Sequence, residues 1–211
     1  MDPIQETDIC RFIETVCISC GKVCNIQAHN ERMNYTRKFH FGDSADLSLE
    51  NYISADGANR LFPDAPRVRC RVTYSDLIEK VEYFKYDIRR VDKLKLVEDN
   101  EADYSFKSAD RSVLDRNFVL RENADDVLIV RNGRITDTSI ANVAFLKDNI
   151  WYTPQFPLLN GTRRRILLEM CMIMESDIKA EDIHKFERVR LFNAMIDFGE
   201  IDLDVSSALI W

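Results

Sequence analysis

The chain has 211 residues, 45% of them hydrophobic and 31% charged, which is enough to bury the core of one large domain or two modest ones. Its formal net charge of −7 argues against general nucleic-acid binding, because such binding depends on Lys and Arg neutralising phosphates. No apolar run approaches the roughly 20 residues of a membrane helix, and the acidic start MDPIQETDIC is unlike a secretory signal, so we expect a cytoplasmic protein that does not bind membranes.

Patterns of strands and short helices alternate through the first hundred residues. The predicted elements are a hairpin over 11–29 that turns at Gly21-Lys22, helices over 29–41 and within 47–62, and strands over 68–74 and 78–97. The acidic segment EDNEAD follows them. We expect this segment to lie in a linker, 99–106, that joins a smaller N-terminal domain, 1–98, to a larger C-terminal domain, 107–211.

The second half predicts a helix over 112–120, two hairpins and a further helix. Asn132-Gly133 between two β-rich runs is the strongest short signal for a hairpin, and Asp148-Asn149 lies between another pair of such runs. A helical pattern over 162–174 comes after Gly161. We expect the Met and Leu side chains of this helix to belong to the core.

Three cysteines stand close together in the first hairpin. Cys17, Cys20 and Cys24 form a C-x2-C-x3-C pattern with His29 nearby, which superficially resembles a zinc cluster. Structural zinc sites usually take their ligands from two separated pairs, and no second Cys/His pair follows here. We therefore expect no metal and interpret these cysteines as small buried hydrophobic residues.

Five segments combine polar residues with strand and turn patterns. In chain order they are FIETVCISCGKVCNIQAHNERM, DYSFKSADRSVLDRN, VLIVRNGRITDTSIANVAFL, IWYTPQFPLLNGTRRRILLE and LFNAMIDF. Together they cover nearly the whole chain and resemble the class IV aminotransferase family of pyridoxal-phosphate (PLP) enzymes, which includes D-amino-acid and branched-chain aminotransferases and 4-amino-4-deoxychorismate lyases. The resemblance implies a mixed α+β, two-domain PLP fold of type IV, with a small α/β domain and a larger β-rich domain.

The second segment places Lys107 where the family carries its cofactor lysine. The resemblance implies that Lys107 forms a Schiff base with the PLP aldehyde, and that the amine later serves as a general base at the substrate α-carbon. A lysine amine has an ordinary pKa of about 10.4, so burial beside cations must lower the pKa for this role. Taken alone, Lys107 would be interpreted as an exposed lysine at the start of a helix.

The third segment places Asp137 where the family usually has a Glu that bonds the pyridine nitrogen of PLP. A carboxylate there keeps the nitrogen protonated, which lets the ring accept electrons. Asp is one methylene shorter than Glu, so the fine geometry must differ. The resemblance also implies that Asn142 supports the pyridine side. Taken alone, Asp137 equally suits a turn and Asn142 a turn or strand.

Contacts to the cofactor phosphate are implied at three places: a guanidinium clamp at Arg32, backbone N–H groups at Gly161, Thr162 and Arg163, and a loop donor at Asn193 and Ala194. The family's usual Ile-Thr after the glycine is Thr-Arg here, so the hydroxyl has moved by one position. Backbone contacts do not depend on side-chain identity. Taken alone, Arg32 is an ordinary arginine on a helix surface. We interpret His29 as a capping or packing residue.

The resemblance implies a PLP-dependent homodimer that acts on a small amino-acid-like substrate. Transamination and lyase-type elimination both stay open, although Asn193-Ala194-Met195 is more similar to the lyase branch. Three arginines are candidates for holding a substrate carboxylate, and each equally suits a solvated surface position: Arg69, Arg71 and Arg89. We expect a short variant with a reduced N-terminus. A protein that kept the fold for binding or regulation, without catalysis, is the alternative.

Overall fold

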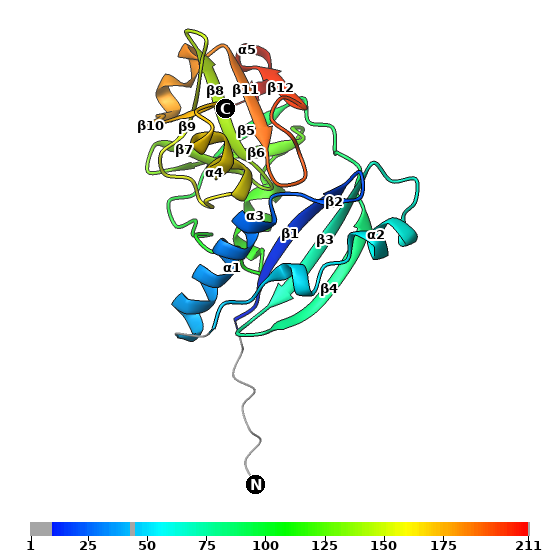
Figure 1. Cartoon of the computed structure of the whole chain (residues 1–211). Coiled ribbons are helices and arrows are strands. Elements are labelled where there is room, and N and C mark those ends of the chain that lie inside the picture. The colour runs from blue at the N-terminus through cyan, green and yellow to red at the C-terminus, as the bar shows by residue number, and fades with distance from the viewer. Residues whose placement is uncertain (1–9, 43–44, 211) are drawn as a thin grey trace. The chain divides into compact units, whose positions relative to one another are not determined.

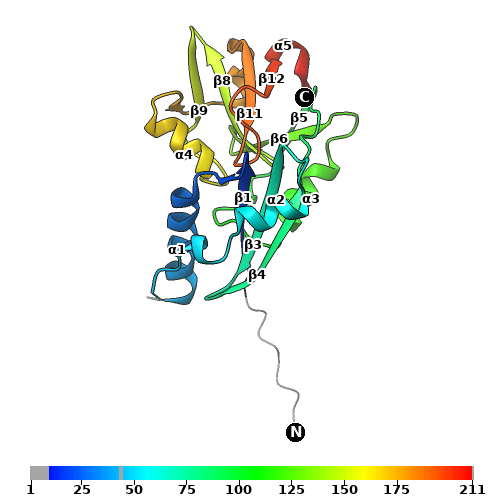
Figure 2. The ribbon, with the colours of Figure 1, turned by 45° about the vertical axis from the view of Figure 1, so that its right-hand side comes forward.

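The computed structural model describes residues 10–42 and 45–210, and the chain divides into two compact units. The first unit comprises the chain up to Lys85 together with Phe106–Asp110, and the second comprises Tyr86–Ser105 and the chain from Arg111 onward. Figures 1 and 2 show that helices and strands occur in both units. The predicted mixed α+β class is confirmed.

This division differs from the expected boundaries of 1–98 and 107–211. The strand β5 (Leu94–Glu98) pairs in parallel with β6 (Asp126–Arg131), so it belongs to the second unit. The EDNEAD segment is also built into this unit, because the Asp99 carboxylate accepts a hydrogen bond from Asn117 Nδ2 at 2.7 Å. Ala102 is fully buried. The segment is therefore part of a packed structure and not a free linker.

The first unit contains an antiparallel sheet in the order β2-β1-β3-β4. Its elements are β1 (Phe12–Ser19), β2 (Lys22–Val23), α1 (Ile26–Phe41), a 3-10 turn (Leu49–Asn51), α2 (Ala55–Leu61), β3 (Arg67–Tyr74) and β4 (Ile78–Lys85). The helices and strands expected here are present. The hairpin turn lies one residue earlier than predicted, at Cys20-Gly21, whose positive φ angles of 49° and 73° match a tight two-residue turn.

The core of the first unit follows from the alternation of β1 and β3. Every second residue of β3 is buried, and the same face of β1 presents Phe12, Val16 and Ile18. Met33 of α1 is also fully buried in this cluster. Figures 1 and 2 both show α1 running beside the sheet. Burying these apolar side chains fixes which face of α1 and β1 is turned inward.

The second unit contains two sheets with the orders β10-β9-β8-β11-β12 and β13-β5-β6-β7. Besides β5 and β6, its elements are α3 (Ser112–Val119), β7 (Arg134–Thr138), β8 (Asn142–Lys147), β9 (Ile150–Pro154), α4 (Thr162–Glu169), β10 (Met174–Ser176), a 3-10 helix (Ala180–Lys185), β11 (Arg188–Phe192), β12 (Ile201–Asp204), α5 (Val205–Ala208) and β13 (Leu209–Ile210).

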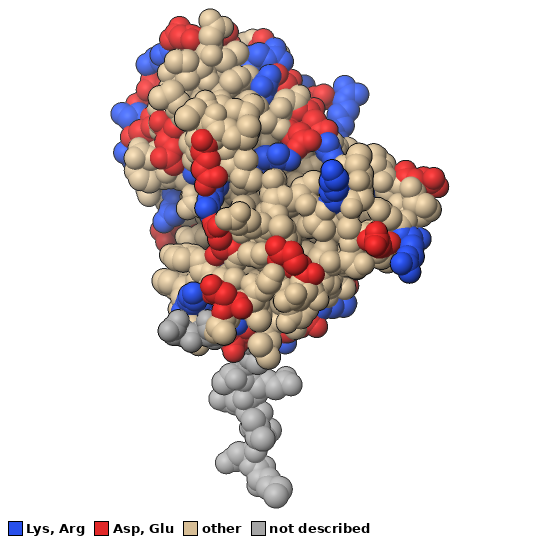
Figure 3. Space-filling view, viewed as in Figure 1, with Lys and Arg blue, Asp and Glu red and all other residues tan. Residues whose placement is uncertain are grey.

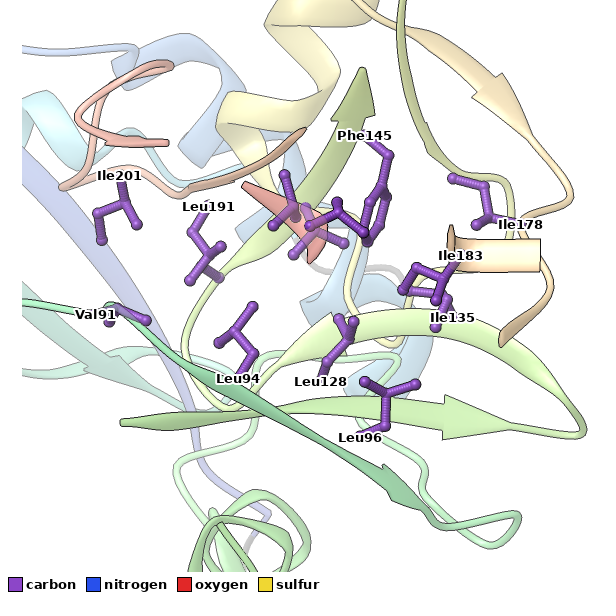
Figure 4. Packing of buried hydrophobic residues seen from close by; sticks show 14 of the residues in the cluster. Val91, Leu94, Leu96, Leu128, Ile135, Phe145, Ile178, Ile183, Leu191 and Ile201 are labelled. Carbon is purple, nitrogen blue, oxygen red and sulfur yellow. The ribbon is translucent and has the colours of Figure 1, made fainter. Parts of the chain in front are cut away.

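The main core of this unit gathers side chains from both sheets. Figure 4 shows Leu94 and Leu128 of one sheet with Phe145 and Leu191 of the other, all buried in one cluster. Successive residues of β6 alternate between this cluster and a second one that includes Leu114 of α3. The strand is therefore buried on both faces, which explains its continuous apolar run.

Both predicted hairpins of the second unit are confirmed. Asn132 and Gly133 join β6 to β7 with φ angles of 52° and 71°, and Asp148 and Asn149 join β8 to β9 with φ angles of 51° and 62°. Positive φ at both central residues is the geometry that matches the twist of paired strands. Turn chemistry alone was sufficient to place these connections.

The helix expected over 162–174 is shorter than predicted and has 8 residues. α4 ends at Glu169, and Cys171 takes a φ of 54°, which ends the helix with a bond from the Met172 N–H to the Leu167 carbonyl. The chain then pairs as β10 with β9. The expectation that the Met side chains of this stretch are core is wrong, because Met170, Met172 and Met174 are exposed. Leu167 is buried as expected.

The three clustered cysteines have different environments. Cys17 is buried, Cys24 is half-buried and Cys20 is exposed at the hairpin turn, so the interpretation as buried hydrophobic residues holds for Cys17 alone. Within residues 10–42 and 45–210, no group of three or more potential metal ligands is close enough to hold an ion. Over the same residues, no helix has the length and apolar character needed to cross a membrane.

Candidate functional site

In the first unit, β1 holds the segment that carries Lys107. The Ile13 N–H donates to the Lys107 carbonyl at 2.9 Å, and the Ala109 N–H donates to the Arg11 carbonyl at 2.8 Å. Ser108 also forms an isolated bridge with Phe12. The Lys107 side chain is half-buried. The backbone of Lys107 is therefore fixed to β1 at the level of Ile13.

Arg32 lies on α1 and is bound to a fully buried carboxylate. Its Nε donates to Glu14 Oε1 at 2.9 Å and its Nη2 donates to Glu14 Oε2 at 2.5 Å. His29 Nδ1 is 2.6 Å from the same Oε2. Glu14 and His29 are both completely buried, whereas 15% of the Arg32 side chain is exposed. Arg32 is thus neither an ordinary surface arginine nor fully enclosed.

The charges of this cluster are well defined. Burial raises the pKa of Glu14, but Arg32 and His29 outweigh it and bring the pKa to about 2. Burial lowers the pKa of His29, and Arg32 and Lys107 lower it further, against the opposing effect of Glu14. Near neutral pH the cluster therefore contains a carboxylate, a guanidinium and a neutral imidazole, whose Nδ1 carries the proton that Glu14 accepts.

In the second unit, Asp137 of β7 is buried with both carboxylate oxygens occupied. Asn142 Nδ2 donates to Oδ1 at 2.8 Å, and the Leu159 N–H donates to Oδ2 at 2.9 Å. Burial raises the pKa of Asp137 to about 6, although these bonds and the more distant charge of Arg164 oppose the rise. The donors in contact with this carboxylate are neutral, so it lacks a bonded cation within the described chain.

Asn142 joins Asp137 to Gly161. Besides Asp137, the Asn142 Nδ2 donates to the Leu159 carbonyl at 2.9 Å. A Cβ atom at Gly161 would overlap the Asn142 Oδ1 atom, so no larger residue fits at position 161 while Asn142 keeps its place. The φ of Gly161 is −67°, so the glycine is required by this close approach and not by its backbone conformation. The structure thus brings together three of the residues that the sequence singled out.

α4 starts at Thr162, and Gly161 is its N-cap residue. Within the described chain no side chain caps this terminus, and its first turn contains no acidic residue. Thr162 is buried. Arg163 forms an ion pair with Asp197, and the buried Arg164 donates to the Pro154 carbonyl at 2.9 Å and to Glu175 at 2.6 Å. Helix N–H groups without a competing carboxylate suit an anion such as phosphate.

The loop after β11 is shaped by the side chain of Asn193. Its Nδ2 donates to the Ile140 carbonyl at 2.9 Å, and its Oδ1 accepts from the N–H groups of Met195 at 2.8 Å and Ile196 at 3.0 Å. The Asn193 side chain is therefore committed to the loop itself. Of the two donors expected at Asn193 and Ala194, a backbone N–H is the one that this geometry favours.

Comparison with known proteins identifies the family. The family model of amino-transferase class IV matches residues 11–202. The chain belongs to this family. Members of the class IV family to which the chain is similar include PLP-dependent aminotransferases and lyases. The predicted fold type IV and the enzyme class are confirmed.

Two sequence relatives span nearly the same length. An uncharacterized protein of Haemophilus influenzae is 35% identical over 184 residues, which are 87% of this chain and 97% of the relative. The crystal structure of a "putative 4-amino-4-deoxychorismate lyase" from Haemophilus somnus 129pt is 33% identical with a TM-score of 0.81, over 89% of this chain and 97% of that one. A PLP-bound hypothetical aminotransferase from Mycobacterium tuberculosis has a TM-score of 0.76 over 94% of this chain and 81% of its own, and at 17% identity it shows the fold alone.

The residues of this class IV chain fit PLP in both units. Asp137 is a buried anion whose bonded donors are neutral, and a pyridinium N–H would supply the missing cation. The backbone N–H groups at the start of α4 and the partly exposed guanidinium of Arg32 are donors of the kind that a phosphate dianion takes. Each unit therefore contains groups whose chemistry fits PLP.

Glu14 was not predicted as a site residue, and the interpretation of His29 as a capping or packing residue was incomplete. His29 is not a cap, because Asn25 occupies that position, and it is bonded and not merely packed. Two signals could have found the pair. Glu14 shares a strand face with Phe12 and Val16, where a charge needs a partner, and His29 is three residues before Arg32 on one helix face.

Proposed function

We propose that this class IV chain is a PLP-dependent enzyme that carries its cofactor covalently on Lys107 and acts on an amino-acid-like substrate. In this proposal Arg32 and the start of α4 at Gly161–Arg163 bind the phosphate, with a loop donor at Asn193-Ala194. Asp137 binds the pyridine nitrogen and is oriented by Asn142. The observation that carries the proposal is the buried Asp137, whose bonded donors among the described residues are neutral. Its position is the one for which the sequence resemblance implies contact with the pyridine nitrogen.

The chain's own residues then have distinct tasks. Bound PLP supplies an electron sink for the bond that is broken at the substrate α-carbon. The Lys107 amine accepts the proton from that carbon and returns it. The Asp137 carboxylate keeps the pyridine nitrogen protonated, which its burial makes effective because opposite charges attract strongly away from water. Arg32 anchors the phosphate through charge-assisted hydrogen bonds.

We propose that the reaction is a lyase-type elimination. An example of such a reaction is the conversion of 4-amino-4-deoxychorismate to 4-aminobenzoate and pyruvate. Two observations favour it over transamination. The Haemophilus somnus protein named for this activity is 33% identical over nearly the full length of both chains. The loop Asn193-Ala194-Met195 is similar to the lyase branch. The aminotransferase structures are below 25% identity and so add the fold, not the reaction.

Arg69 and Arg71 are the best candidates for binding a substrate carboxylate. Arg89, the third candidate, already pairs with the buried Asp126 at 2.6 Å. Arg69 and Arg71 lie on one face of β3, and their buried Nε atoms have no hydrogen-bond partner among the described residues. Guanidinium groups of this kind suit a carboxylate. We propose that these two arginines select an anionic substrate.

The deciding experiment compares two products. Purified protein with PLP is incubated with 4-amino-4-deoxychorismate, and pyruvate is measured. In parallel, keto-acid formation is measured from a panel of L- and D-amino acids with an acceptor keto acid. We expect pyruvate release that is lost in Lys107→Ala and reduced in Arg71→Gln. Keto-acid formation without pyruvate release would make the chain a transaminase.

Three further expectations stay predictions. A non-catalytic role would be supported if PLP formed its covalent link to Lys107 while neither reaction occurred. The homodimer is tested by sedimentation, in which a strict monomer would contradict it. The cytoplasmic location is tested by fractionating cells.

On the face shown in Figure 3, Lys and Arg are interspersed with Asp and Glu and do not form a basic area of the kind that nucleic acid requires.

A further inference from the structure

Consecutive residues of β1 bond Lys107 and Arg32, two cationic residues of the first unit. The backbone N–H of Ile13 bonds the carbonyl of Lys107, and the side chain of the next residue, Glu14, bonds Arg32. A β-strand advances about 3.3 Å per residue and alternates its faces, so neighbouring positions are rigidly spaced. Lys107 and Arg32 are therefore both hydrogen-bonded to the same short stretch of β1.

Glu14 fixes the orientation of the Arg32 guanidinium and not merely its position. Its two oxygens meet Nε and Nη2 at 2.9 and 2.5 Å, which is the fork-to-fork geometry of a bidentate pair. This pairing holds the Nε–Nη2 edge of the guanidinium plane on the two oxygens of Glu14. Because the carboxylate is completely buried, it has little freedom to move with the arginine.

His29 in turn fixes Glu14. Its Nδ1 lies 2.6 Å from Oε2, and its ring, which projects from α1, is completely buried. The carboxylate accepts, so the imidazole donates from Nδ1. Three groups from one strand and one helix face are thus bonded in the order His29, Glu14 and Arg32, with Arg32 alone partly exposed.

We propose that Glu14, supported by His29, is a positioning residue that aims the Arg32 guanidinium at the phosphate of the cofactor and sets its distance from Lys107. The inference rests on the proposed function, because it takes Arg32 as a phosphate ligand and Lys107 as the cofactor lysine. In this proposal Glu14 binds neither the phosphate nor the aldehyde of the cofactor. It acts through Arg32.

A purely electrostatic role for Glu14 predicts the opposite result. If Glu14 only neutralised Arg32, its removal would leave the guanidinium charge uncompensated, and a phosphate would bind more tightly. If Glu14 aims Arg32, removing one of the two bonds releases the guanidinium, and the phosphate binds more weakly. The sign of the change therefore separates the two roles.

The test uses PLP and pyridoxal, which differ only in the phosphate. Their dissociation constants are measured by absorbance titration of the Lys107 linkage in wild type, Glu14→Gln, Arg32→Met and the double variant. We expect Glu14→Gln to weaken PLP roughly tenfold, the loss of about one charge-assisted hydrogen bond, and pyridoxal less than twofold. In the Arg32→Met background, Glu14→Gln should leave the PLP-to-pyridoxal ratio unchanged.

An unchanged or tighter PLP affinity in Glu14→Gln would overturn the inference, as would an equal loss of both ligands. Breaking a buried pair can prevent folding, so His29 offers a second measurement. His29→Leu should raise the ratio of the PLP to the pyridoxal dissociation constant by about threefold, from loss of one supporting bond, and His29→Asn, which keeps a donor near the Nδ1 position, should restore the wild-type ratio. An unaltered ratio in both would also overturn it. If wild type links neither ligand to Lys107, the proposed function fails instead.

Discussion

Two buried carboxylates, one in each unit, have pKa values that are shifted in opposite directions. Glu14 is bonded to Arg32 and His29, and its pKa falls to about 2. Asp137 is bonded to the neutral Asn142 amide and the Leu159 N–H, and its pKa rises to about 6. Burial acts in the same direction on both groups, so the bonded cation accounts for the difference.

The two carboxylates differ in whether the chain itself supplies a bonded cation. Glu14 has its counter-charge within the first unit, so its role is internal support. Asp137 has no bonded cation among the described residues, which is the arrangement that the proposed contact with a ligand cation requires. The pyridinium of PLP is such a cation. Substitutions at Glu14, or at Asp137 and its neighbours, can therefore test this difference.

The largest expected effect is on the stability of the first unit. Glu14→Ala leaves the buried His29 and Arg32 without their acceptor, and breaking a buried pair costs about 3–5 kcal/mol. Urea denaturation of wild type and variant measures this loss. Glu169→Ala is the matched control, because Glu169 forms an exposed pair with Arg165 that contributes about 0.3–0.5 kcal/mol. Similar losses in both variants would break the contrast.

The next effect is a pH dependence carried by Asp137. Its folded pKa of about 6 is above the ordinary aspartate value of 3.8, so the folded state binds the proton more tightly and loses stability as pH rises from about 4 to 6. Relative to Asp137→Asn, wild type without PLP should lose roughly 3 kcal/mol across this range, two pKa units at 1.36 kcal/mol each. Thermal unfolding against pH measures it. PLP should flatten the slope, and a slope of the opposite sign would contradict the assignment.

A third change disturbs the neutral donors of Asp137. Gly161→Ala places a Cβ where the Oδ1 of Asn142 lies, so Asn142 must move and its bond to Asp137 is strained. Overpacking of this kind costs about 1–3 kcal/mol. The Gly161→Ala, Asn142→Ala double variant removes the obstacle and should regain part of that stability in chemical denaturation. No relief in the double variant would show that another contact requires the glycine.

The smallest expected effect concerns Arg163. This residue replaces the family's usual Thr, and its side chain pairs with Asp197, which is half exposed. A partly exposed pair contributes less than about 1 kcal/mol. Arg163→Ala should therefore leave the unfolding midpoint and the PLP affinity nearly unchanged, because the backbone N–H groups remain. A tenfold loss of PLP affinity would assign the guanidinium a direct role.

Local rules predicted much of the fold but not the support of the site. Asn132-Gly133 placed a hairpin because the turn requires positive φ at both residues. The early end of α4 depends on Cys171 adopting a left-handed conformation, which its residue type does not favour. The division of the chain into units depends on the pairing of β5 with β6, a contact between segments distant in sequence.

The candidate site residues likewise fall into those that local motifs predict and those that depend on contacts distant in sequence. Lys107, Asp137 and Gly161 were predicted because short motifs surround them. Glu14 was missed because its role depends on two partners on a neighbouring helix, 15 and 18 residues away. Period-two alternation shows that Glu14 faces the core, yet it does not show which cation meets it there.

The most direct test of the account is to locate the covalent link. The protein is incubated with PLP, reduced with borohydride and digested, and the peptides are analysed by mass spectrometry. The account predicts one reduced pyridoxyl-phosphate group, on Lys107, and none on that peptide in Lys107→Ala. A modification on another lysine, or none in wild type at PLP concentrations that saturate known class IV enzymes, would contradict it.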